Sequence, residues 1–168
     1  MTIPLRAMAL VVVAAAVGAC GFQLRGWDMA AAIDSAYVTS DMHNPLEAPL
    51  RQGLRQANVR EAATPAEAQV VVRLMDSRSE RRSITVSEQA RAAEYETILS
   101  VLYEVTDPEG RQLVAPQWLE RARVFRVDRD NVVGTREEQA LLEGEMQNDL
   151  VQQIIRSINA VVGSGDAT

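Results

Sequence analysis

Cys20 is the only cysteine in the chain, and it follows a short apolar segment near the N-terminus. Upstream of it lie one positive charge, Arg6, and an uninterrupted apolar run of 11 residues from Ala7 to Val17. This layout is typical of a secretory signal peptide. A helix of that length reaches about 16 Å, roughly half the thickness of a bilayer core, so a permanent transmembrane helix is not expected. The sequence therefore predicts that residues 1–19 form a signal that is removed.

The residues around Cys20 resemble a bacterial lipobox, in which the cysteine thiol accepts a diacylglyceryl group before the signal is cleaved. Small residues, Gly18 and Ala19, stand directly before it. Cys20 would then begin the mature protein and carry acyl chains, whose buried CH₂ groups each contribute about 0.8 kcal/mol to membrane binding. Gly21 stands where an Asp commonly retains lipoproteins in the inner membrane, which favours an outer-membrane anchor. The alternative is an unmodified cysteine near an ordinary cleavage site.

The composition of the chain favours a single domain after the signal. Removal of the first 19 of the 168 residues leaves 149, enough for one substantial core. All 17 basic residues are arginine, and 23 acidic residues give the full chain a formal charge of −6. A nucleic-acid-binding domain is usually basic, so nucleic acid is not an expected partner. We place one domain at 20–162 and a disordered tail at 163–168.

Catalytic and metal-binding chemistry lack the necessary side chains in this sequence. His43 is the only histidine, and the only thiol is expected to be acylated. These residues form neither a catalytic triad nor the ligand spacing of a metal site. No Gly-rich phosphate loop or nucleotide fingerprint occurs. We therefore expect no catalytic residues, no metal, and no cofactor beyond the covalent lipid on Cys20.

The domain contains several strand patterns. The clearest lies between Tyr95 and Thr106, where apolar or aromatic side chains recur at the odd positions over twelve residues. Asp107 to Gly110 then fit a type I turn, with Asp first, Pro second and Gly fourth. Four strands are predicted, at 33–40, at 69–75 with a continuation at 84–86 beyond an Arg-rich stretch, at 95–106 and at 118–127.

The sequence also predicts two helices. Asn44 can cap the first, with Pro45 at its first position and Glu47 three residues after the cap; a start at Pro49 is the alternative, and Asn58 is a plausible stop. The second begins at the capping box from Thr135 to Glu138 and runs to about Val162. Its predicted apolar stripe comprises Leu142, Met146, Leu150, Ile154, Ile158 and Val161.

The order of these elements predicts an α/β (α+β) two-layer sandwich. We expect a four-stranded, mainly antiparallel sheet with both helices on one face. The other face, which carries Ile98 and Leu102 among polar neighbours, would then need cover.

Several stretches of the chain resemble the LPS-assembly lipoprotein family LptE of Gram-negative bacteria. Residues 20–26, Cys-Gly-Phe-Gln-Leu-Arg-Gly, resemble the family's mature start. Ala93, Glu94 and Tyr95 resemble its hallmark at the head of the long strand. The final helix is also similar in residue type and spacing, at Thr135 to Gln139, Met146, Asp149, Leu150, Gln153, Ile154 and Ile155.

This resemblance implies a two-layer α/β sandwich that sits as a plug in the lumen of the outer-membrane β-barrel LptD. The pair forms the lipopolysaccharide translocon. The family also assists LptD assembly and binds lipopolysaccharide for insertion at the cell surface. Such a partner would cover the free sheet face, and the lipid anchor would face the periplasm.

Lipopolysaccharide carries phosphates on lipid A, which suit guanidinium groups. The arginines near the tip of the long hairpin and the start of the last helix are therefore predicted to bind it. Family members place basic residues where Glu88 and Thr135 stand here. The alternative is that the arginines are solvated or pair with nearby acids. The predicted set is Arg81, Arg82, Arg91 and Arg136.

The sequence is also compatible with two other classes of function. One is a generic outer-membrane lipoprotein that scaffolds another envelope complex. The other is a periplasmic enzyme, which the missing catalytic groups disfavour.

Overall fold

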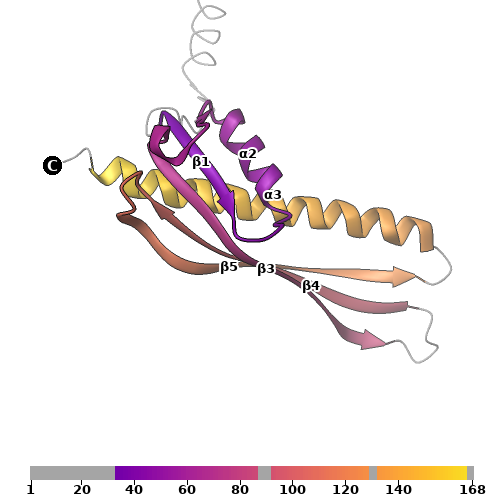
Figure 1. The fold of residues 1–168 in the computed structure, drawn as a ribbon. Helices are drawn as coiled ribbons and strands as arrows, with labels where there is room; N and C mark the ends of the chain where they lie inside the picture. Colours follow the sequence, from indigo (N-terminus) through magenta and orange to yellow (C-terminus); the bar gives the residue numbers. More distant parts are fainter. Residues whose placement is uncertain (1–32, 87–91, 129–131, 166–168) are drawn as a thin grey trace, which may run out of the picture.

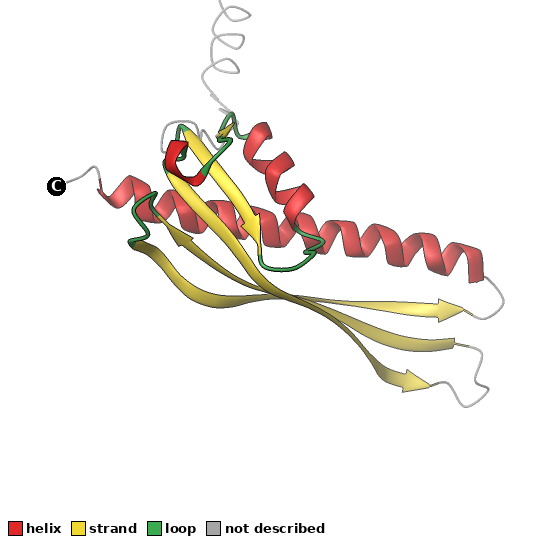
Figure 2. Ribbon diagram, viewed as in Figure 1, coloured by secondary structure: helices red, strands yellow, loops and turns green. Residues whose placement is uncertain are grey.

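The computed structural model describes residues 33–165 apart from 87–91 and 129–131. Two helices lie on one side of a five-stranded sheet, so the molecule is a two-layer α+β sandwich (Figures 1 and 2). The predicted signal peptide and Cys20 lie outside the described residues. In chain order the elements are β1 (Ser35–Ser40), α2 (Glu47–Gln56), β2 (Arg60–Glu61), the 3-10 turn η2 (Pro65–Glu67), β3 (Val70–Val86), β4 (Ala92–Thr106), β5 (Gln112–Asp128) and α3 (Val132–Gly165).

The strands follow the order β2-β1-β3-β4-β5 across the sheet. β1 runs parallel to both β2 and β3, whereas β3, β4 and β5 form an antiparallel meander. The predicted two-layer sandwich with both helices on one face is confirmed. The sheet has five strands rather than four, because the chain after α2 adds the two-residue strand β2 beside β1. A pair of residues is too short to show a periodic pattern, so β2 could not be predicted.

The Arg-rich stretch that separates the two apolar parts of β3 belongs to a single strand of 17 residues. Leu74 pairs with Tyr103, but Asp76 pairs with Leu102, so Met75 is an extra residue in a β-bulge. Because side chains alternate along a strand, this bulge reverses which positions face the helices. Leu74 points into the core, whereas Asp76 lies on the opposite face. Ile84 marks a second bulge of the same kind.

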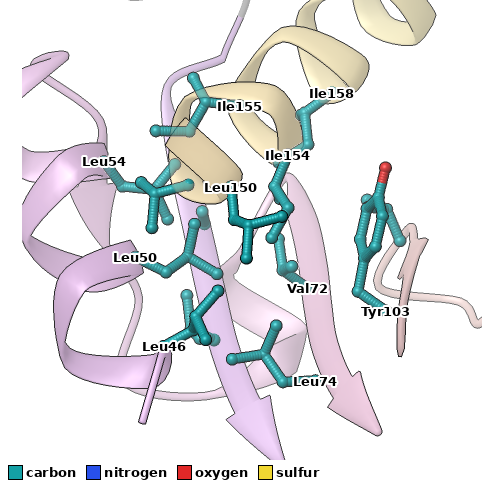
Figure 3. Close-up of a cluster of buried hydrophobic side chains, with 14 of the residues drawn as sticks. Leu46, Leu50, Leu54, Val72, Leu74, Tyr103, Leu150, Ile154, Ile155 and Ile158 are labelled. Atoms are coloured by element: carbon teal, nitrogen blue, oxygen red, sulfur yellow. The ribbon is translucent and has the colours of Figure 1, made fainter. Parts of the chain in front are cut away.

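The core lies between the two helices and one half of the sheet. This is the half in which β1 and β2 lie beside β3 and in which a turn joins β4 to β5. The predicted apolar stripe of α3 is confirmed at its centre, since Met146, Leu150 and Ile154 have no exposed surface. Tyr103 of β4 is also fully buried, and its hydroxyl lies 2.8 Å from the Ser157 Oγ of α3. Figure 3 shows this cluster, which includes Leu46, Leu50, Leu54, Val72, Leu74, Tyr103, Leu150, Ile154, Ile155 and Ile158.

The start of α2 falls between the two predicted positions. Asn44 does not cap the helix, because its Oδ1 accepts the Leu46 N–H two residues later, at 3.0 Å, in a turn that precedes it. The side chain of Glu47 accepts a hydrogen bond from Ser40 on β1 at 2.5 Å and pairs with Arg51 at 2.9 Å. These two hydrogen bonds, that from Ser40 first, lower the pKa of Glu47. The carboxylate therefore fixes α2 to the sheet.

Three other predicted boundaries are corrected by the structure. α3 begins at Val132, so Thr135 lies within its first turn rather than at its cap. A capping box is only a local signal, and no proline before it prevents the helix from starting earlier. The helix also continues to Gly165, so the first part of the predicted disordered tail is helical. β5 starts at Gln112 rather than Trp118, because it pairs with β4 directly after the turn.

The end of α2 and the turn at 107–110 agree with the sequence signals. Asn58 follows the last residues of α2 with a φ of 61°, the left-handed conformation that ends many helices. Gly110 donates its N–H to the Asp107 carbonyl at 3.0 Å and has a φ of 83°. The carboxylate of Asp107 also accepts the Arg111 N–H at 2.7 Å. This turn therefore joins β4 and β5 through a local hydrogen-bond network.

The crossing of the two helices depends on Gly53. A Cβ at this position would lie 2.7 Å from Val151 Cγ1 and 3.2 Å from Ile155 Cδ1, both on α3. We expect Gly53→Ala to lower the unfolding free energy by about 1–2 kcal/mol, because the helices must separate. Gly144→Ala is the matched control, since a Cβ there would meet nothing within 4 Å. It should raise stability by about 1 kcal/mol through helix propensity. Urea unfolding of both variants tests whether the unfolding free energy falls in Gly53→Ala and rises in Gly144→Ala.

Candidate functional site

One face of the sheet carries none of the helices that the structure describes, and we call it the outer face. It comprises the side chains at the even positions of β4 and their cross-strand neighbours on β3 and β5. Leu102, for example, lies between Asp76 on one side and Trp118 on the other. Trp118 is 43% exposed and Val124 is 55% exposed, which is unusual for large apolar side chains on a regular sheet. Arginine and glutamate side chains alternate with them.

The outer face is hollowed beside Trp118, and we call this feature the Trp118 hollow. It has a volume of about 260 Å³. Ile98, only 5% exposed, lies among its lining residues, and the guanidinium of Arg78 lies 4.4 Å from the centre of the Trp118 ring. An arginine over an indole is a cation–π contact. The hollow is lined by Arg78, Glu80, Arg82, Ile98, Ser100, Trp118 and Glu120.

Opposite charges on the outer face are largely paired within the chain. Arg78 lies 3.0 Å from Asp76, and Arg126 lies 2.8 Å from Glu94 across β4 and β5. The hydrogen bond to Glu94 raises the pKa of Arg126. These pairs are exposed to solvent, where each contributes little to stability. The face is therefore amphipathic without carrying a strong net charge.

The structure separates two of the predicted lipopolysaccharide-binding arginines. Arg81 and Arg82 are neighbours on one strand, so their side chains leave it on opposite faces. Arg81 lies on the helix-facing side, with its guanidinium 5.0 Å from the ring centre of Tyr95. Arg82 lies on the outer face, 3.8 Å from Glu80. The two side chains therefore do not form one anion-binding patch.

The remaining predicted site residues are only partly covered by the structure. Arg136 is exposed in the first turns of α3, which begins beside the far end of β5 (Figure 1). Arg91 and Cys20 lie outside the described residues. Arg81, Arg82 and Arg136 are thus the predicted residues that the structure describes, and all three are exposed. Of these, Arg82 has an acidic neighbour on its own face, Glu80.

Three residues of the Trp118 hollow were not predicted as site residues from the sequence: Arg78, Trp118 and Glu120. No local pattern joins them, because Arg78 lies on β3 whereas Trp118 and Glu120 lie on β5. The pairing of both strands with β4 places them on the same face as Ile98. Among the residues that the structure describes, no three His, Cys, Asp or Glu side chains are placed to hold a metal ion. None of its described helices is long and apolar enough to cross a membrane.

The fold defines a class of bacterial lipoproteins. Rare lipoprotein B from Shewanella oneidensis has the same architecture, with a TM-score of 0.63, 26% identity, and coverage of 75% of this chain and 94% of that one. An uncharacterized lipoprotein B from Nitrosomonas europaea matches with a TM-score of 0.73 and 22% identity, over 86% of this chain and 94% of that chain.

Sequence comparison identifies the family within this class. The family model described as LptE, lipopolysaccharide-assembly, matches residues 29–158. LPS-assembly lipoprotein LptE of Photorhabdus laumondii is 30% identical over 84% of this chain and 78% of its own length. The LptE of Pectobacterium atrosepticum is 26% identical over 86% and 79%, respectively. The chain belongs to the LptE family, as the resemblance predicted.

Proposed function

We propose that this chain is a non-enzymatic, outer-membrane lipoprotein subunit of the lipopolysaccharide translocon. In this role it plugs a β-barrel of the LptD type, assists the assembly of that barrel and binds lipopolysaccharide for insertion. Its membership of the LptE family supports the role in lipopolysaccharide assembly. The lipid anchor at Cys20, directed to the periplasmic side of the outer membrane, belongs to the same proposal.

The observation that best supports the barrel partner is the outer face, over which no described helix lies. A sheet face that carries Trp118 and Val124 beside ion-paired arginines suits a partner surface that is itself both apolar and polar. The lumen wall of a β-barrel supplies the polar part of such a surface, because its inward-facing side chains are polar and meet water. Burial of Trp118 between Arg78 and such a wall would make it an interface anchor, since Trp and Arg dominate binding energy at interfaces.

A pull-down from solubilised outer membranes tests this proposal. Tagged wild-type protein should capture one barrel of the LptD type in equal amount, as measured by mass spectrometry. Trp118→Glu should reduce the captured barrel at least ten-fold, because it places a carboxylate in the centre of the proposed interface. Leu141→Glu is the matched control, since Leu141 is 64% exposed on α3 and lies away from the outer face. It should leave the capture unchanged.

Lipopolysaccharide measured in the same pull-down tests the ligand. We expect Arg81→Ala combined with Arg136→Ala to lower the bound lipopolysaccharide several-fold without changing barrel capture. Arg60→Ala on β2, an exposed arginine far from the tip of the hairpin, serves as the control. Capture of a different envelope protein in place of a barrel would instead support the alternative, a lipoprotein that scaffolds another complex.

A further inference from the structure

Glu120 carries a negative charge in the Trp118 hollow that has no ionic partner among the residues that the structure describes. Its carboxylate accepts a hydrogen bond from the neutral Ser100 hydroxyl at 3.3 Å. The other carboxylate in the lining, that of Glu80, lies 3.8 Å from the guanidinium of Arg82. The hollow therefore contains one carboxylate that the described part of the chain does not neutralise.

Arg78 is the cation that the strand register places nearest to Glu120, but its guanidinium is engaged elsewhere. The two residues lie on either side of Ser100, on β3 and β5. Arg78 donates two hydrogen bonds to the Asp76 carboxylate, at 3.2 and 3.0 Å, and lies over the Trp118 ring. Its charge is thus already balanced, and the carboxylate of Glu120 faces a hollow that is open to a partner.

Cover of the outer face by the proposed barrel would remove water from Glu120. A charged group that loses its water without gaining an opposite charge is strongly unfavourable. Truncating one partner of a buried charge pair at a protein interface weakens binding for the same reason. A barrel wall that covers the outer face must therefore supply a cation opposite Glu120.

The hollow suits one long cationic side chain. Its volume of about 260 Å³ admits a single side chain that projects from a flat wall. Ile98 and Trp118 provide apolar surface in the lining. Lysine and arginine lay their methylene stems along such surface and keep the charged head in a polar environment. The head group would then lie at Glu120.

We infer that the Trp118 hollow receives one arginine or lysine side chain from the lumen wall of the barrel partner. The stem of that side chain lies on Ile98 and Trp118, and its charge pairs with Glu120. This inference rests on the proposed function, because it identifies the chemical group of the barrel that the outer face recognises. Trp118 contributes apolar contact area, whereas Glu120 selects a cation.

Charge reversal at Glu120 tests this contact by capture of the barrel from solubilised outer membranes. Glu120→Arg should lower the captured barrel at least ten-fold, because two cations would meet in the hollow, and the neutral variant Glu120→Gln should lower it about three-fold. Glu145→Arg is the matched control, since Glu145 is an exposed glutamate on α3, away from the outer face, and it should leave capture unchanged. Each variant should keep the wild-type urea midpoint, because both glutamates are exposed.

A charge exchange identifies the partner side chain. Each lumen-facing arginine and lysine of the captured barrel is replaced by glutamate, one at a time. One of these barrel variants should restore capture by Glu120→Arg to within about two-fold of the wild-type level and should weaken capture by the wild-type chain. If none of them restores capture, the inference is overturned.

The remaining outcomes separate this inference from the proposed function. Undiminished capture by Glu120→Arg, together with lost capture by Trp118→Glu, would reject the cation in the hollow and leave the barrel partner in place. A fall in bound lipopolysaccharide with barrel capture intact would assign Glu120 to an amine of that lipid and reject the barrel side chain. Absence of any barrel from the wild-type capture would reject the proposed function and this inference with it.

Discussion

The Leu150→Ala variant is expected to lose about 3 kcal/mol of unfolding free energy. Leu150 has no exposed surface and lies where α3 meets both α2 and the sheet (Figure 3). Truncation removes buried methyl groups and leaves a cavity that two helices and a sheet cannot easily close, and such changes cost about 2–5 kcal/mol. For a domain of this size, the melting temperature should fall by about 10 °C.

Leu141→Ala provides the control for this measurement. It makes the same chemical change on the same helix, but Leu141 is 64% exposed, so the unfolding free energy should change by no more than about 0.5 kcal/mol. Urea titrations of both variants give the comparison. Equal losses for the two would mean that α3 does not dock on the sheet through the stripe that contains Leu150.

Replacement of Cys20 by serine is expected to abolish lipid attachment completely. The thiol is the proposed acceptor of the diacylglyceryl group, and a hydroxyl does not replace it in the lipobox. Several acyl chains provide a strong membrane anchor, because each buried CH₂ contributes about 0.8 kcal/mol. Incorporation of labelled palmitate in growing cells should fall from full labelling to background.

Gly21→Ala is the control for the lipid measurement, since it keeps the cysteine and changes one neighbouring residue to another small one. It should retain full labelling. Palmitate labelling is independent of barrel binding, so the result is separate from the pull-down with Trp118→Glu. Unchanged labelling in Cys20→Ser would show that the lipid is attached elsewhere and that residues 17–20 are an ordinary cleavage site.

The parts of the fold that the sequence predicts well are those in which one face is buried over many residues. The odd positions of β4 and the stripe of α3 repeat a simple period, and both face the core. Val151 and Ile155 were missed because they form a second row on α3, packed beside Gly53 of α2. A single stripe on one helix does not reveal that a second helix crosses it.

The parts that the sequence did not predict depend on pairing between distant residues. Nothing local in the Arg-rich part of β3 indicates a strand, because both of its faces are polar and exposed. Its strand structure follows from a full hydrogen-bonded ladder with β4. The capping signals at Asn44 and Thr135 also gave wrong helix starts. Asn44 forms a tight turn before α2, and α3 is longer than predicted, because it begins before Thr135.

The candidate site could likewise be predicted only in part from the sequence. The arginines near the hairpin tip can be identified by residue type. That Arg81 and Arg82 lie on opposite faces follows only from the pairing of β3 with β4. The Trp118 hollow is lined by residues of three strands that are far apart in the sequence. Ser100 and Glu120 alone are separated by 20 positions. A single sequence contains no signal that joins such residues.

The two bulges in β3 also show where relatives can differ in length. Deletion of one residue elsewhere in the strand would exchange its two faces, and Arg78 would then point toward the helices. Deletion of Met75 or Ile84 would only straighten the strand, because each is the residue without a cross-strand partner. Alignments of this family should therefore place single-residue gaps in this strand at those two positions.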